Sequence, residues 1–99
     1  MLLKQMEYFQ AVVECGNFYL AAERCCISQS AISQQIKKLE NELGVQLMTR
    51  HNRTFSLTQA GEHFYGKSLV IKSDTEQLIR EVKHIKETLN KSTVEKANR

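Results

Sequence analysis

The sequence predicts a mainly α-helical domain that contains one small β-hairpin and ends in a long helix. Three observations predict this class. The 99 residues include no proline and only four glycines, so few positions interrupt a helix. Apolar residues recur every three or four positions over most of the chain, whereas Val45, Leu47, Phe55 and Leu57 alternate with polar residues on either side of the polar stretch 49–54. A chain of this length suits one small domain with one modest core.

The composition favours a soluble, cytoplasmic protein. No apolar run approaches the roughly 20 residues that span a bilayer, and no signal-peptide pattern opens the chain. The formal net charge of +3 permits a polyanionic partner without requiring one. Cys15, Cys25 and Cys26 have neither disulfide-framework nor zinc-ligand spacing, so we expect reduced, mostly buried thiols and neither a metal nor a cofactor.

Two helices are predicted in the first 26 residues. The first should run from about Leu3 to Cys15 and end at Gly16, because its apolar residues are spaced four, three and four: Leu2, Met6, Phe9 and Val13. Asn17 can cap a short second helix that ends near Cys25 or Cys26. Its small residues, Ala21 and Ala22, would let a third helix approach closely.

The third helix, predicted over residues 28–43 with Ser28 as its N-cap, is the most informative segment. Its apolar face comprises Ile32, Ile36, Leu39 and Leu43. Its opposite face carries only hydroxyls, amides and a cation: Gln29, Ser30, Ser33, Gln34 and Lys37. These groups can bind base edges and phosphates, which is typical of a recognition helix. Two short helices joined by a tight turn describe a helix-turn-helix, but the pattern fits two helices of a bundle equally well.

The alternating stretch after Gly44 predicts a small β-hairpin, or wing, whose apolar residues are Val45, Leu47, Phe55 and Leu57. Its loop, residues 49–54, holds Arg50, His51 and Arg53, with no acid between Gln46 and Gln59. A phosphate backbone or a minor groove suits such a loop, and a solvated basic turn is the alternative.

Thr58 can cap the long last helix, which carries heptad-spaced residues in two series. One series is Phe64, Ile71, Leu78 and Ile85; the other is Ser68, Thr75, Val82 and Leu89. We expect this stripe to form a homodimer, because so long a helix exceeds what a small domain covers; the alternative is that it folds back. The predicted organisation is a domain over 1–58, a helix over 59–90 and a disordered polar tail over 91–99.

The chain resembles the N-terminal DNA-binding domain of bacterial LysR-type transcription regulators over residues 3 to 89. The matching residues occur in register: Phe9, Gly16-Asn17-Phe18, Ala21 to Arg24, Ser28 to Ser33, Gln35-Ile36, Leu39-Glu40, Leu43-Gly44-Val45, Leu47, Arg50, Leu57-Thr58 and Ala60-Gly61.

The resemblance implies a winged helix-turn-helix whose third helix enters the major groove of double-stranded DNA. It also implies a linker helix that pairs two subunits, tetramers and pseudo-palindromic sites in the full protein, and an effector-binding domain of roughly 200 residues. No such domain is expected within this chain, so a small-molecule effector would act only through a C-terminal domain outside it.

The predicted contact residues form two sets. Those expected to bind DNA are Ser28, Gln29, Ser30, Ser33, Gln34, Lys37, Lys38, Arg50 and Arg53, with Ser28 chiefly a cap and the two arginines on phosphates. Those expected to dimerise are Phe64, Ile71, Leu78, Val82, Ile85 and Leu89.

Two residues of the third helix depart from the family's pattern. Proline is common at the position of Ser30, and arginine at that of Gln34. Because a glutamine amide pairs with adenine whereas arginine favours guanine, we expect an A·T preference at the base that Gln34 faces.

Three other functions compete with DNA binding. An enzyme is not expected, because no Gly-rich phosphate loop, metal-ligand spacing or acid pair is present. A dimerisation module that never touches DNA would use the same long helix, and a gel shift at low and raised salt would distinguish it. Redox sensing through Cys25 or Cys26 lacks a basic cluster that would lower a thiol pKa.

Overall fold

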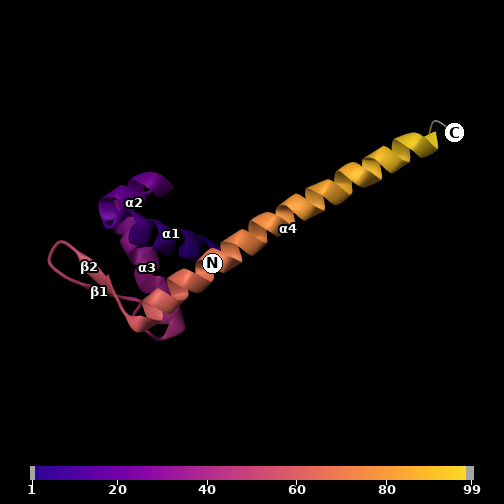
Figure 1. Cartoon of the computed structure of the whole chain (residues 1–99). Coiled ribbons are helices and arrows are strands. Elements are labelled where there is room, and N and C mark those ends of the chain that lie inside the picture. The colour runs from indigo at the N-terminus through magenta and orange to yellow at the C-terminus, as the bar shows by residue number, and fades with distance from the viewer. Residues whose placement is uncertain (1, 98–99) are drawn as a thin grey trace. The chain divides into compact units, whose positions relative to one another are not determined.

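The computed structural model describes residues 2–97, with side chains described for residues 3–90. The elements are α1 (Leu2–Cys15), α2 (Phe18–Cys25), α3 (Gln29–Leu43), β1 (Met48–Arg50), β2 (Phe55–Leu57) and α4 (Gln59–Ala97) (Figure 1). This order confirms the predicted fold class. The chain forms two compact units, Met1–Leu69 and Val70–Arg99.

The helix starts are capped as the sequence predicts. The Asn17 side chain accepts a hydrogen bond from the backbone N–H of Leu20 at 2.8 Å, and the Ser28 hydroxyl accepts one from Ala31 at 3.1 Å. These bonds satisfy backbone donors that have no partner within the helix. Each side chain therefore fixes where α2 or α3 begins.

The helix ends use left-handed residues. Gly16 and Gly44 follow α1 and α3 with φ values of 79° and 71°, which a residue without a Cβ adopts at no steric cost. Cys26 takes the same conformation after α2, with φ 58°, although it carries a Cβ. The turn between α2 and α3 therefore contains the one strained non-glycine backbone position in residues 2–97.

The core of the first unit lies where α1, α2 and α3 each pack against the other two. Its buried apolar residues are Met6, Phe9, Ala11, Val12, Ala21, Ala22, Ile32, Ile36, Leu39, Leu47 and Met48. Leu43, expected on the buried face of α3, is instead 45% exposed. It is the last residue of α3, and Leu47 and Met48 complete the core beyond it.

The hairpin pairs β1 and β2 antiparallel, with Thr49 opposite Ser56 and Arg50 opposite Phe55. It begins later than the alternating pattern suggests, since Val45 lies outside β1 and is 45% exposed. The physical reason is that the Val45 N–H still bonds to the Glu40 carbonyl at 3.2 Å, so this residue terminates α3 rather than starting a strand.

The first turns of α4 belong to the first unit and pack against the root of the hairpin. Thr58 caps the helix by accepting from the Gly61 N–H at 3.0 Å, and its own hydroxyl donates to the Gln46 carbonyl at 2.7 Å. Gly61 lies so close to the hairpin that a Cβ there would be 1.8 Å from the carbonyl oxygen of Leu47. The sequence position of Gly61 therefore requires a residue without a side chain.

Two members of the predicted heptad stripe also belong to this part of α4. Phe64, expected in a dimer seam, packs edge-to-face on Phe9 with ring centroids 5.3 Å apart. Ser68 is buried and accepts a hydrogen bond from the Gln10 amide at 3.0 Å. These residues face α1 because Gly61 brings the start of α4 against the domain, so Phe64 is removed from the proposed dimer seam.

In the second unit, α4 carries exposed side chains at nearly every position from Val70 to Asn90. In the structure α4 extends to Ala97, and the expected disorder of the tail stays a prediction. Residues 91–97 contain no glycine or proline and include alanine, lysine and glutamate, which favour helix. Asn98 and Arg99, the end of the expected tail, lie outside the described residues. Among the described helices, none is long and apolar enough to cross a membrane.

Candidate nucleic-acid interface

The outer face of α3 has the predicted composition. Gln29, Ser30, Gln34 and Lys37 are exposed and Ser33 is half-buried, while Ile32, Ile36 and Leu39 on the opposite face are buried. The apolar face fixes the rotation of the helix on the core, so the polar face must point outward. No acid occurs between Gln29 and Lys38, and this face therefore offers amides, hydroxyls and cations to a ligand.

The structure places the other predicted contact residues at the edges of this face. Ser28 is the N-cap of α3, as expected, and its hydroxyl lies 3.2 Å from that of Ser30. Lys38 is exposed on α3, and Arg53 is exposed in the loop between β1 and β2. All nine predicted residues therefore come from α3, its cap or the hairpin.

The guanidinium of Arg50, predicted from the sequence to contact a phosphate, has partners within the protein. One nitrogen donates to the Ser33 hydroxyl at 2.7 Å and another reaches the Ser33 carbonyl at 3.5 Å. The guanidinium carbon also lies 4.6 Å from the ring centroid of Phe18. Arg50 thus joins the hairpin to both helices of the helix-turn-helix.

A hollow lies between the start of α2, the start of α3 and the hairpin tip. Phe18 and Phe55 form its apolar base, with ring centroids 6.1 Å apart in an edge-to-face arrangement. Tyr19, Gln29 and Arg53 contribute polar groups to its lining. A sugar-phosphate strand could therefore contact α3 and the hairpin tip at once.

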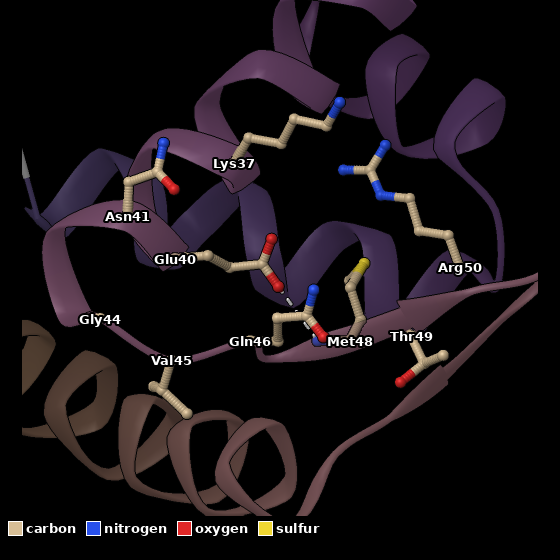
Figure 2. A pocket seen from close by; sticks show the side chains of 9 residues that line it. All are labelled: Lys37, Glu40, Asn41, Gly44, Val45, Gln46, Met48, Thr49 and Arg50. Carbon is tan, nitrogen blue, oxygen red and sulfur yellow. Dashed lines mark hydrogen bonds between the residues drawn. The ribbon is translucent and has the colours of Figure 1, made fainter.

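A second hollow follows the far half of α3 and β1 (Figure 2). Its lining includes Lys37, Asn41, Gln46 and Arg50. Figure 2 shows the side chains of Lys37 and Arg50 extending toward the same edge of this hollow. Lys37 supplies a cation at this rim, which suits an anionic backbone better than a neutral ligand, whereas the Arg50 guanidinium is already bound to Ser33.

Glu40, at the base of the second hollow, is a residue that the sequence interpretation missed. Its carboxylate accepts a hydrogen bond from the backbone N–H of Leu47 at 2.8 Å. It accepts a second from the backbone N–H of Met48 at 3.3 Å (Figure 2). It thereby holds the root of β1 against α3. One clue was present, since Glu40 follows buried Ile36 by four residues and so borders the apolar face.

The cysteines give little support to a redox site. Cys25 is half-buried, and burial raises the pKa of its thiol above the ordinary value. A raised pKa disfavours the reactive thiolate. Cys15 is also half-buried and Cys26 is exposed, so the thiols are less buried than expected. Within the part of the chain that the structure describes, no group of histidines, cysteines and acids could hold a metal ion.

Comparison with known proteins assigns the domain. Residues 3–62 match the model of the bacterial regulatory helix-turn-helix proteins of the lysR family. The chain belongs to the lysR family. Its similarity to the HTH-type transcriptional regulator BenM of Acinetobacter baylyi is 40% identity over 85 residues, which is 86% of this chain and 28% of BenM. The chain therefore spans about a quarter of the length of this LysR relative.

Solved structures of LysR proteins agree with this assignment. A complex of the BenM DNA-binding domain with benA site 1 DNA has a TM-score of 0.82 and 40% identity, covering 86% of this chain and 99% of that one. A complex of the CbnR DNA-binding domain with DNA has a TM-score of 0.80 and 36% identity, covering 84% and 95%. The fold found here is therefore that of LysR domains solved on DNA.

Proposed function

We propose that this chain binds double-stranded DNA sequence-specifically, with α3 in the major groove and the loop 49–54 at the backbone or minor groove. The observation that carries the proposal is the outer face of α3. It presents amides, hydroxyls and Lys37 on a helix whose other face is fixed by the core. The LysR domains solved with DNA share this fold, which supports the same use of α3.

The proposed base contacts come from Gln29, Ser33 and Gln34, whose amide and hydroxyl groups lie on the outer face of α3. A glutamine amide can donate to adenine N7 and accept from adenine N6, so we expect an A·T pair opposite Gln34. Lys37, Lys38 and Arg53 supply charge for phosphates, and the cap Ser28 and Ser30 can add hydroxyl contacts.

Selection of bound duplexes from a random library tests this proposal. Gln34→Ala should relax the preference at one base pair by about 1 to 3 kcal/mol and leave other positions unchanged. Gln77→Ala, an exposed glutamine of the second unit, is the control and should select the same sequence as the unmodified chain. An unchanged preference in Gln34→Ala would remove Gln34 from the base contacts.

We also propose that α4 pairs two copies of the chain. Ile71, Leu78, Val82 and Ile85 are exposed on α4 at spacings of seven, four and three residues, which are those of a coiled-coil seam. Leu89 continues the series. Two linked copies of α3 would read half-sites about one helical turn or a multiple apart.

The wider role is that of a bacterial transcription regulator acting on cytoplasmic DNA, which the lysR family supports. Effector control would belong to a further domain, since BenM is several times longer than the matched region. A module that only dimerises is the second candidate, favoured by the same exposed stripe. Absence of any gel shift with A·T-rich duplex, at low and raised salt alike, would favour that module.

A further inference from the structure

We propose that Arg50 is a positioning residue that fixes how α3 presents Ser33 to DNA, and that it does not neutralise a phosphate. This inference rests on the proposed DNA-binding function. It concerns the specificity of binding, because Ser33 lies on the proposed reading face of α3 while Arg50 lies on the hairpin.

The first argument is the geometry of the guanidinium. It donates to both the hydroxyl oxygen and the carbonyl oxygen of Ser33, at 2.7 and 3.5 Å, and its central carbon lies over the Phe18 ring. A guanidinium can make these contacts together because its donors are fixed in one plane and its face stacks on aromatic rings. A phosphate would have to compete with three contacts that already exist.

The second argument is that these contacts connect four elements, namely both strands of the hairpin, α2 and α3. Arg50 pairs with Phe55 across the hairpin, and the Phe55 ring packs edge-to-face on Phe18 of α2. Phe18 in turn lies under the guanidinium that binds Ser33 of α3. Moving the hairpin would therefore break contacts on both helices of the helix-turn-helix.

The third argument concerns the chemistry of Ser33. Its hydroxyl oxygen accepts from Arg50, which leaves its O–H free to donate. A donor suits acceptors on base edges, such as N7 of a purine or O4 of thymine. Arg50 therefore orients Ser33 as a donor, and its loss would let the hydroxyl rotate and relax that preference.

Arg53 provides a matched comparison in the same hairpin. It has the same charge and is exposed, but no hydrogen bond, ion pair or ring contact is found for it among the described residues. We expect Arg53 to contact phosphate, so the two arginines should affect binding in different ways. The salt dependence of affinity separates them, because each phosphate contact contributes about 0.9 to the slope of log affinity against log salt.

The experiment measures the affinity of the 99-residue chain for the duplex that it selects and for a scrambled duplex, over a range of salt. Arg53→Gln should lower the salt slope by about 0.9 and keep the ratio of the two affinities. Arg50→Gln should keep the slope and lower the ratio about tenfold. Arg50→Lys should lower the ratio of the two affinities similarly, since an ammonium can neither donate from two nitrogens in one plane nor stack on an aromatic ring as a guanidinium does.

Ser33→Ala should lower the ratio to the same extent, and combining it with Arg50→Gln should add no further loss. All variants are measured well below their midpoints of thermal unfolding, so that reduced stability does not mimic reduced specificity. The inference is overturned, with the proposed function intact, if Arg50→Gln lowers the salt slope but leaves the ratio of the two affinities unchanged. It is also overturned if Arg50→Lys keeps the ratio of the unmodified chain. If the unmodified chain binds no duplex, the proposed function fails as well.

Discussion

The two compact units of this chain contain similar helical patterns of apolar residues but bury them very differently. In the first unit, Phe9, Ile32 and Leu39 have no exposed surface. In the second, Leu78 and Val82 are 58% and 56% exposed. The first unit carries its own core, whereas an isolated helix is marginally stable in water, which is a reason for the proposed pairing of α4 with a second copy. The spacing of apolar residues thus predicts helices in both units, but only in the first unit does the same chain cover the apolar face.

The largest expected effect tests the close contact between Gly61 and Leu47 within the first unit. Gly61→Ala should destabilise the first unit by about 3 kcal/mol or more, because the new Cβ would meet the Leu47 carbonyl oxygen, a backbone atom that cannot move away freely. Chemical denaturation followed by circular dichroism measures the loss.

Gly66→Ala is the matched control on the same helix. A methyl group at this position would have no atom within 4 Å, so this change should stabilise by about 1 kcal/mol through helix propensity. If both substitutions have the same sign, close packing at Gly61 is not what holds the start of α4 within the first unit.

The second prediction concerns the second unit. Leu78→Ser should weaken self-association at least tenfold, since each copy loses about 1.5 to 3 kcal/mol of apolar burial in the proposed seam. Sedimentation equilibrium measures this change, and the unfolding of the first unit should be unaffected. Lys83→Ser, an exposed lysine of the same helix, should leave the association constant nearly unchanged. Equal effects of the two variants would argue against a seam through Leu78.

The third prediction returns to the first unit, at the root of the hairpin. Glu40→Gln should destabilise it by about 1 to 2 kcal/mol, because a neutral amide replaces a carboxylate that accepts from two backbone N–H groups. Glu42→Gln changes the same charge at an exposed position of α3 and should have little effect. A loss of equal size in Glu42→Gln would indicate an effect of net charge rather than of the Glu40 contacts.

The features that sequence predicted well are local ones. Asn17, Ser28 and Thr58 cap helices because a side-chain oxygen accepts from the backbone N–H three residues ahead, and this spacing is visible in the sequence. The polar face of α3 was equally readable, since rotation by about 100° per residue separates it from Ile32 and Ile36.

The features that sequence missed depend on distant contacts. Arg50 meets Ser33 across 17 positions, and Phe64 meets Phe9 across the whole domain, so neither pairing follows from spacing. Gln5 was not foreseen as buried, yet its side chain has no exposed surface and no hydrogen-bond partner among the described residues. Which side of an amphipathic helix is covered, and by what, is decided by tertiary packing.

The smallest expected effect lies in the turn between α2 and α3, where local and tertiary demands disagree. Cys26 holds a left-handed backbone that costs a residue with a Cβ about 1 kcal/mol, so Cys26→Gly should stabilise the first unit by up to this amount. The gain is partly offset by the greater entropy of glycine in the unfolded chain. Cys26→Ala removes the exposed thiol but keeps the Cβ, and it should give no gain in thermal or chemical unfolding. Equal stabilisation by both variants would assign the cost to the thiol rather than to the backbone, and the turn would then be unstrained.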